Sequence, residues 1–147
     1  MELKVLTPAE EVTLLNKLQL VNFIYEHIGH NKDTREDIKK AIDYALNPYP
    51  LAGGFILYYE EKGEVIGVAL LNNTGMQGYV PENLLVYLIT HKDHRKKGLG
   101  RKLLQKAMEM TSGDMALHIE KDHPALAFIK EMGFENPFLE MRLHKEG

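Results

Sequence analysis

The chain contains no cysteine among its 147 residues. This absence excludes disulfide bonds, thiolate metal sites and thiol nucleophiles, and it fits a reducing compartment. The longest aliphatic and aromatic run, Leu84 to Ile89, is too short to cross a bilayer. Residues Met1 to Leu6 alternate in polarity and lack the apolar stretch of a secretory signal. We therefore expect a cytoplasmic protein that does not bind membranes.

The sequence also lacks a strong excess of either charge. Its formal net charge of -3 gives no reason to expect binding to nucleic acid. It has no internal repeat, no low-complexity tract and no linker rich in proline, glycine or serine. A chain of this length can bury a sufficient core without disulfide or metal staples. We expect a single domain over residues 1–147.

The hydrophobic periodicity predicts ten elements in the order β-α-α-β-β-β-α-β-α-β. Strands are expected over 1–6, 55–60, 65–71, 84–90, 115–119 and 139–144. Helices are expected from the capping box Thr7-Pro8-Ala9-Glu10 to Gly29, from Asp33 or Thr34 to before Pro48, from about Gly98 to Met108, and from Asp122 or His123 to Gly133. The first helix is expected to bury Val12, Leu15, Leu18, Val21, Tyr25 and Ile28.

The predicted fold class is α/β: a mixed (α+β) sheet flanked by helices on both faces. Leu84 to Thr90 is continuously apolar, which predicts a central strand buried on both faces. The strand, loop, helix and strand over residues 84–119 form a crossover unit, so these two strands should be parallel. The helix after Gly98 is expected to bury its apolar residues, Met108 included.

The segment 95–102, Arg-Lys-Lys-Gly-Leu-Gly-Arg-Lys, is the most informative, because five of its eight residues are cationic. It lies at the expected start of a helix, where cations are unfavourable unless an anion binds. Gly98 and Gly100 remove Cβ atoms where a ligand would approach the first-turn amides. The pattern favours a polyphosphate or pyrophosphate ligand. The alternative is a solvated basic turn whose glycines only let the chain bend.

Arg95-x-x-Gly98-x-Gly100 after a buried strand resembles the acyl-CoA-binding signature of the GNAT N-acetyltransferase superfamily. The second signature of that family, an Asn, an Ala, an aromatic residue and Gly-Phe at the end of a short helix, is similar to Asp122 to Phe134. Its matching residues are Ala125, Phe128, Gly133 and Phe134. The order of elements also resembles the GNAT fold, so the resemblance covers nearly the whole chain.

The resemblance implies acetyl-CoA as cosubstrate, no metal, and direct attack by a primary amine of a small molecule or peptide in a ternary complex. It implies that three segments bind CoA. They comprise Leu88, Ile89 and Thr90 on the strand, Arg95, Lys96, Lys97, Gly98, Leu99, Gly100 and Arg101 at the pyrophosphate, and Asp122, Ala125 and Phe128 in the second motif. The strand end would diverge from the strand at 115–119, and the N-H of Ile89 or Thr90 would stabilise the oxyanion.

The sequence departs from the family pattern at four places. Ile129 stands where the family commonly has the tyrosine that protonates the leaving thiolate, Asp122 replaces the usual asparagine, and Lys92 replaces a strand-end proline. Asp122 is equally well explained as a helix cap. The segment after Phe134 is short, which predicts a reduced last hairpin and a more open acceptor pocket.

Tyr87, His118 and Glu82 are the candidates for proton transfer, with Glu82 acting through a water molecule. For Tyr87 and His118 the alternative is a packed, hydrogen-bonded core residue, and for Glu82 an exposed charge at a strand start. The pairs His91 with His94 and His27 with His30 have spacings that suit a metal, but two imidazoles alone form a weak site, and no metal is predicted.

Four acidic residues of the second helix favour a cationic acceptor, unless they only form a solvated helix face. They are Asp33, Glu36, Asp37 and Asp43. Two other functions remain open: a CoA-binding regulatory or interaction module without catalysis, which the missing tyrosine would allow, and a plain nucleotide-phosphate binder. Sheet edges near the shortened C-terminus also allow a homodimer.

Overall fold

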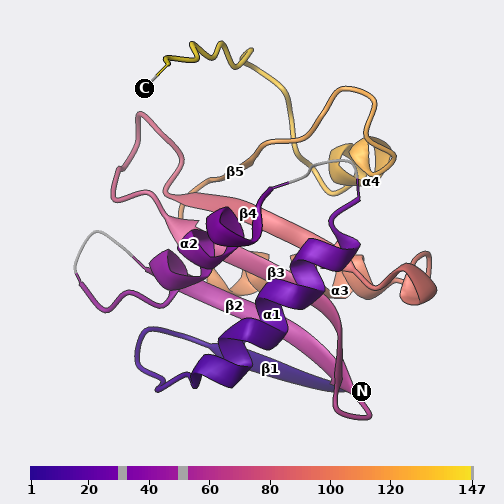
Figure 1. The fold of residues 1–147 in the computed structure, drawn as a ribbon. Coiled ribbons are helices and arrows are strands. Elements are labelled where there is room, and N and C mark those ends of the chain that lie inside the picture. The colour runs from indigo at the N-terminus through magenta and orange to yellow at the C-terminus, as the bar shows by residue number, and fades with distance from the viewer. Residues whose placement is uncertain (30–32, 50–52, 147) are drawn as a thin grey trace.

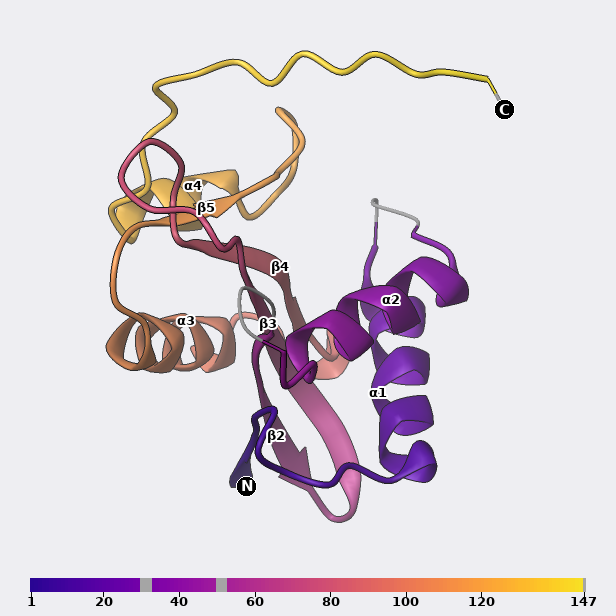
Figure 2. The same ribbon diagram turned by 90° about the vertical axis from the view of Figure 1, so that its left-hand side faces the viewer.

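A five-stranded mixed sheet with helices on both faces forms the body of the molecule (Figures 1 and 2). The computed structural model describes residues 1–29, 33–49 and 53–146. The strands lie in sequential order, β1 (Glu2–Leu6), β2 (Gly54–Glu61), β3 (Glu64–Asn73), β4 (Asn83–Thr90) and β5 (Met115–Leu117). The helices are α1 (Leu14–His27), α2 (Arg35–Ala45), α3 (Leu99–Met110) and α4 (Leu126–Glu131), with a short 3-10 turn η1 (Lys92–His94).

Neighbouring strands are antiparallel except for β4 and β5, which are parallel. The predicted hairpin is therefore confirmed as β2 and β3, and the predicted crossover as β4, α3 and β5. The mixed sheet flanked by helices is the fold class expected from the sequence.

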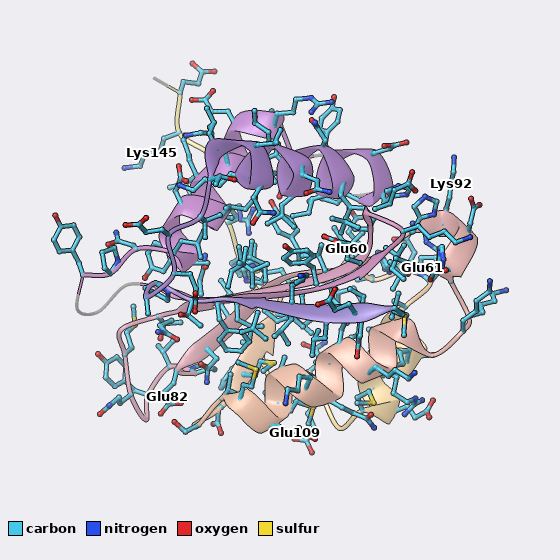
Figure 3. The ribbon with its side chains drawn as sticks, turned by 90° about the horizontal axis from the view of Figure 1, so that it is seen from below. Glu60, Glu61, Glu82, Lys92, Glu109 and Lys145 are labelled. Atoms are coloured by element: carbon cyan, nitrogen blue, oxygen red, sulfur yellow. The ribbon has the colours of Figure 1, made fainter. Side chains whose placement is uncertain are left out.

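Each face of the sheet carries its own hydrophobic cluster. The α1 and α2 side packs Ile24, Ile38 and Ile42 against β-strand residues such as Val68, and all four are fully buried. The opposite side packs α3 and α4 against the sheet; its helical members are Leu99, Leu103, Leu104, Ala107 and Ile129. Figure 3 shows the sheet between these two layers of helices.

Helix α1 begins later than its first capping signal predicts. Thr7 accepts a hydrogen bond from the Ala9 amide at 3.2 Å, but this turn does not continue into a helix. The N-cap is Thr13, whose Oγ1 accepts from the Asn16 amide at 3.1 Å. Two threonines offer the same local capping chemistry, and the helix begins at the second, where its residues reach the sheet.

The buried face of α1 also differs from the prediction. Leu15, Leu18 and Tyr25 are exposed by 78%, 45% and 46%. Val21 is buried as predicted, and the other buried residues of the helix are Leu20, Phe23, Ile24 and His27. Apolar residues surround much of this helix, so two faces have helical periodicity, and contact with α2 and the sheet decides which one is buried.

Four smaller predictions are corrected. β4 alternates between buried and half-buried residues instead of being buried on both faces, and it is the fourth strand of five. β5 has three residues, two fewer than expected. Met108 is 43% exposed because it lies on the outer side of α3. α4 begins at Leu126 with Ala125 at the N-cap position, not Asp122 or His123.

The predicted last strand over 139–144 is wrong for this chain. The structure shows no helix or strand after α4 in residues 132–146, and the terminal part of this segment leads away from the sheet (Figure 2). Within residues 1–29, 33–49 and 53–146, no helix has the length and apolar character needed to span a bilayer.

Candidate active site

The strands β4 and β5 pair at one end only. Their ladder consists of Asn83 with Met115, Leu84 with Ala116 and Leu85 with Leu117, and it stops there. On its other side, β4 pairs Tyr87 with Leu70 and Leu85 with Leu71, which leaves Val86 without a partner on β3. Such a bulge bends and twists the strand. β4 therefore diverges from β5 beyond Leu85, as the family resemblance implied.

Two residues hold the paired end together, and sequence reasoning assigned a role to only one of them. The buried Asn83 donates from Nδ2 to the carbonyls of Ser112 at 2.7 Å and Asp114 at 3.2 Å. Glu82 accepts from the amides of Asp114 at 2.9 Å and Gly78 at 3.4 Å. These amides lower the pKa of the Glu82 carboxyl from its ordinary value, which makes it a weaker base.

Backbone alternation determines which β4 amides face the divergence. The His91 amide donates to the Ile66 carbonyl of β3 at 2.8 Å. In an antiparallel pair, every second residue bonds its neighbour strand, so the N-H of Ile89 also points to β3. Leu88 and Thr90 then present their N-H groups toward the side where β5 has diverged. Of the two oxyanion donors considered from sequence, this geometry favours Thr90, and it adds Leu88.

The N-terminus of α3 has no side-chain cap. Its N-cap residue Gly98 adopts the left-handed conformation with φ 80° and ψ 5°, and no acidic residue lies in the first turn. By contrast, the helices α1 and α2 are capped by the hydroxyls of Thr13 and Thr34. Unpaired first-turn amides carry partial positive charge and bind anionic oxygens.

The two glycines at this helix start leave room for a ligand. A Cβ built on Gly98 would meet nothing within 4 Å, and on Gly100 only Thr90 Cγ2 at 3.8 Å. Packing within the chain therefore does not require glycine at position 100. Lys96, which has a side chain, also adopts the left-handed conformation with φ 63°, an uncommon geometry that concentrates at functional sites. The segment fits a pyrophosphate.

Four of the five cations of segment 95–102 divide into two groups. Arg95 donates to the His27 carbonyl at 3.0 Å and the Thr90 carbonyl at 3.4 Å. Arg101 bonds Glu131 of α4 at 2.7 Å. These two arginines join the loop to its surroundings, whereas Lys96 and Lys97 are exposed at the start of α3.

Arg95→Ala is expected to lower the free energy of unfolding by about 1 kcal/mol, because two charge-assisted bonds to backbone carbonyls are lost. Lys97→Ala removes the same charge from the same loop and should leave stability within about 0.5 kcal/mol. Urea unfolding of both variants measures the difference. Equal stabilities would contradict a structural role for Arg95.

Gly67 on β3 is a positioning residue that sequence reasoning missed. A Cβ there would lie 3.0 Å from side-chain carbons of both Leu99 and Leu103. The first turn of α3 therefore rests directly on the strand beside Thr90, the Cα partner of Gly67. No local signal separates this glycine from others in the sequence, because the requirement comes from a helix more than thirty residues away.

Three histidines gather where β4 leads into the loop. The ring of His27 lies 4.2 Å from that of His91, which lies 5.4 Å from His94. Burial and the neighbouring His91 lower the pKa of His27. No group of three or more potential ligands in the described part of the chain is arranged to hold a metal. His30, the predicted companion of His27, lies outside the described residues.

The second motif lies beside α3. Phe128 is half-buried and has the Arg101 guanidinium 5.5 Å from its ring centre. Ala125 donates its amide to His123 Nδ1 at 3.0 Å, and Asp122 is exposed in the turn before α4. Ile129, at the usual tyrosine position, is 5% exposed and packs in the core. This position supplies no proton donor.

Tyr87 and Asp33 meet at the start of the divergence on the α2 side. The Tyr87 hydroxyl donates to Asp33 Oδ2 at 2.6 Å, and the tyrosine is 5% exposed. Burial, followed by the hydrogen bond to Asp33, raises the pKa of the Tyr87 hydroxyl far above its ordinary value. Tyr87 is therefore a poor acid, and its bond orients the Asp33 carboxylate.

The other two proton-transfer candidates lie at opposite ends of the paired part of β4 and β5. His118 directly follows β5, is well exposed, and has its Nε2 3.3 Å from Glu140 Oε1. Glu82 lies just before β4, at the end opposite Thr90, and Figure 3 shows it far across the molecule from Lys92. The structure brings Tyr87 and His118 to the diverging part of the strands and keeps Glu82 at the paired end.

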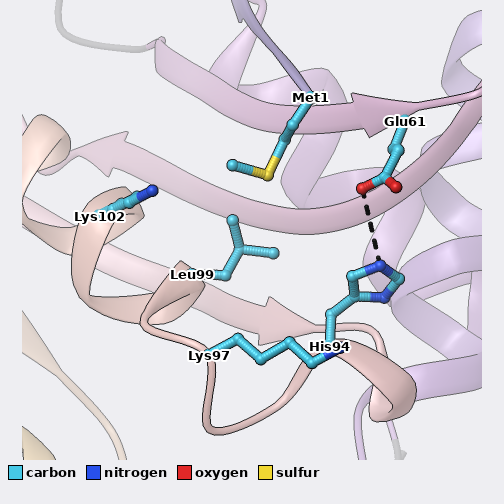
Figure 4. Close-up of a pocket in the computed structure, with 6 residues that line it drawn as sticks. All are labelled: Met1, Glu61, His94, Lys97, Leu99 and Lys102. Carbon is cyan, nitrogen blue, oxygen red and sulfur yellow. Dashed lines mark ion pairs between the residues drawn. The ribbon is translucent and has the colours of Figure 1, made fainter.

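Two surface hollows lie beside α3. One of about 280 Å³ is lined by Glu61, His94, Lys97 and Lys102, with Met1 and Leu99 completing it (Figure 4). The Glu61 carboxylate lies 3.8 Å from His94 Nε2. The other, of about 580 Å³, is lined by Gln105, Met108, Glu109 and Met132. Neither is lined by β4, so neither coincides with the divergence.

Similar folds occur in solved acetyltransferases. A GNAT-family acetyltransferase from Streptococcus pneumoniae TIGR4 is 17% identical with a TM-score of 0.67, covering 99% of this chain and 100% of that one. An aminoglycoside acetyltransferase from an uncultured soil metagenomic sample, solved with sisomicin, is 16% identical with a TM-score of 0.64 over 99% and 96%. A ribosomal-protein-alanine N-acetyltransferase from Brucella melitensis biovar Abortus 2308 is 13% identical with a TM-score of 0.60 over 100% and 99%.

No curated protein matches the sequence. The model of the acetyltransferase (GNAT) family matches residues 19–134, which include the divergence of β4 and β5, the uncapped start of α3 and the second motif. With that match over most of its length and the same fold, the chain belongs to the GNAT acetyltransferase family.

Proposed function

We propose that the protein transfers the acetyl group of acetyl-CoA to the primary amine of a cationic small molecule or peptide. Acetyl-CoA is the cosubstrate of the family. The observation that supports this most directly is the uncapped, glycine-containing start of α3 next to a β4 edge that β5 has left open. The start of α3 suits anionic oxygens, and the open edge of β4 offers backbone groups to the amides of a pantetheine arm.

The pyrophosphate is proposed to bind the first-turn amides of α3, with Lys96 and Lys97 supplying charge. The pantetheine arm would then pair with the open edge of β4. One of the N-H groups of Leu88 and Thr90 would bind a pantetheine amide, and the other would bind the thioester carbonyl. The N-H group at the thioester carbonyl would stabilise the oxyanion that develops during attack. Phe128 and Ala125 border the cosubstrate from α4.

In the proposed reaction the neutral amine attacks the thioester carbon, a C-N bond forms and the C-S bond breaks. CoA leaves as the thiolate, which takes up the proton that the attacking nitrogen loses. The acceptor must first lose its ammonium proton. Asp33, oriented by Tyr87, is proposed to bind the ammonium, and His118, exposed beside the divergence, is proposed to accept its proton. Glu82 has no part in this proposal.

Among the described acidic residues of α2 and the segment before it, Asp33 supports a cationic acceptor best. Asp43 pairs with Lys17 and Lys39 at 3.2 and 3.1 Å. Glu36 and Asp37 lie 4.0 and 3.8 Å from Lys40, so they form a solvated helix face. Asp33 instead bonds the neutral Tyr87 hydroxyl, which leaves its negative charge for an ammonium. The similar fold solved with sisomicin is an aminoglycoside acetyltransferase.

Release of free thiol from acetyl-CoA, measured with a panel of polyamines, aminoglycosides and peptides with free N-termini, tests the proposal. We expect sustained turnover with at least one cationic amine and none with neutral alcohols. Asp33→Asn should raise KM for that amine with little change in the affinity for acetyl-CoA.

The second candidate function is a CoA-binding module without catalysis, which the buried Ile129 at the usual tyrosine position favours. Tight binding of acetyl-CoA without thiol release for any amine would support this module and contradict the enzyme. A nucleotide-phosphate binder would instead bind ATP as tightly as CoA.

A further inference from the structure

The C-terminal segment 138–144 exposes large apolar side chains that nothing in the described part of the chain covers. Phe138, Leu139, Met141 and Leu143 are exposed by 83%, 76%, 88% and 81%. From residue 139 onward they alternate with polar residues, a pattern typical of a strand with one buried face. A contiguous apolar stripe of this kind marks a surface that associates with a partner.

The charged side of this segment contacts its own chain through Glu140. Arg142 donates from Nε to Glu140 Oε2 at 3.1 Å, which places these side chains on one side of the segment. Glu140 also lies 3.3 Å from His118 Nε2. Because alternate residues of an extended chain point to opposite sides, Leu139, Met141 and Leu143 face outward. For the chain's own sheet to bury these three side chains, the segment would have to rotate by half a turn about its length.

The sequence of this segment is self-complementary about Met141. When two copies run antiparallel around a two-fold axis at this residue, Leu139 of one lies opposite Leu143 of the other. Glu140 then lies opposite Arg142, twice. Apolar pairs and opposite-charge pairs directly across two strands each stabilise a ribbon. An isologous contact requires this kind of self-complementary surface.

We propose that residues 138–144 form a strand that pairs with the same strand of a second copy of this chain, antiparallel about Met141. This pairing would form the last strand, which the periodicity predicts but which a single chain does not form. It satisfies backbone groups that are exposed in the monomer, and it gathers six side chains (Leu139, Met141 and Leu143 from each copy) on one face of the ribbon. The proposal does not depend on the catalytic function.

Disulfide trapping tests the register, because the chain has no other cysteine. Met141→Cys places its thiols opposite each other across the two-fold axis, with Cβ atoms about 5 Å apart. In Leu139→Cys the two thiols are offset by four residues, roughly 13 Å. Under mild oxidation we expect a covalent dimer from Met141→Cys and not from Leu139→Cys. A mixture of Leu139→Cys with Leu143→Cys should form a covalent dimer.

Charge reversal tests the pairing without cross-linking. Glu140→Arg or Arg142→Glu creates two like-charge pairs and should weaken the dimer about tenfold by light scattering, whereas the double variant should restore it. Circular dichroism and the melting temperature check that each variant is folded. We expect folded variants because both substituted side chains are exposed. A monomer at every soluble concentration, or equal trapping of Met141→Cys and Leu139→Cys, would overturn the proposal.

Discussion

Gly98→Glu is expected to weaken acetyl-CoA binding at least a hundredfold while the protein stays folded. The carboxylate would stand where the pyrophosphate meets the first turn of α3, and like charges about 4 Å apart near a protein surface repel by about 4 kcal/mol. Open space surrounds a Cβ at this position, so the substitution clashes with nothing. A side chain in the left-handed conformation costs about 1 kcal/mol of stability. Calorimetric titration and thermal unfolding measure the two effects.

Gly78→Glu is the matched control. Gly78 has φ 79°, nearly the same as Gly98, and open space around its Cβ, but it lies in the loop before β4, at the end opposite Thr90. This variant carries the same charge and the same backbone cost and should retain the wild-type affinity. If both variants bind acetyl-CoA equally well, the cosubstrate does not bind at the start of α3.

Proline at Leu88 or Thr90 is expected to lower kcat by about 100-fold to 1,000-fold at whichever position faces the thioester. Proline removes the N-H and with it the oxyanion donor, a loss of that size in other acyl-transfer sites. Because these N-H groups point away from β3, no ladder bond is lost, and stability should change little. Steady-state kinetics with saturating acetyl-CoA provides the measurement.

Alanine at the same two positions separates the N-H from the side chain. Leu88→Ala and Thr90→Ala keep the backbone donor and should keep kcat within about tenfold of wild type, since only substrate positioning changes. Ile89→Pro is the reverse control. Its N-H points to β3, so we expect lost stability before any specific loss of catalysis. Proline variants as active as their alanine counterparts at both positions would exclude a β4 oxyanion donor.

The hairpin and the proposed anion site at 95–102 could be read from the sequence because their signals are local. A short turn with Gly63 between two β-rich runs predicts β2 and β3 whatever packs on them. Likewise, Gly98 and Gly100 among cations at the start of a helix predict an anion site from backbone chemistry alone. The roles of the individual cations were not predictable, because Arg95 and Arg101 bond to residues of α1, β4 and α4.

The start of α1 and the last strand were predicted wrongly for related reasons. Thr7 and Thr13 offer the same capping bond, and the sheet's position determines which one begins the helix. Leu139 to Leu143 have the alternation of a strand, but a strand also needs a neighbour for its backbone groups. Periodicity describes a face that requires burial and does not show what buries it.

By itself the sequence determined the kind and order of the first nine elements, and the clustering of glycines and cations in the loop at 95–102. These follow from the spacing of apolar residues and from glycines and caps a few residues apart. Only the tertiary structure decided that β4 diverges from β5 after Leu85, that Gly67 admits the first turn of α3, and that Tyr87 orients Asp33. Each depends on groups far apart in the chain, whose distance is set by the packing of the whole sheet against its helices.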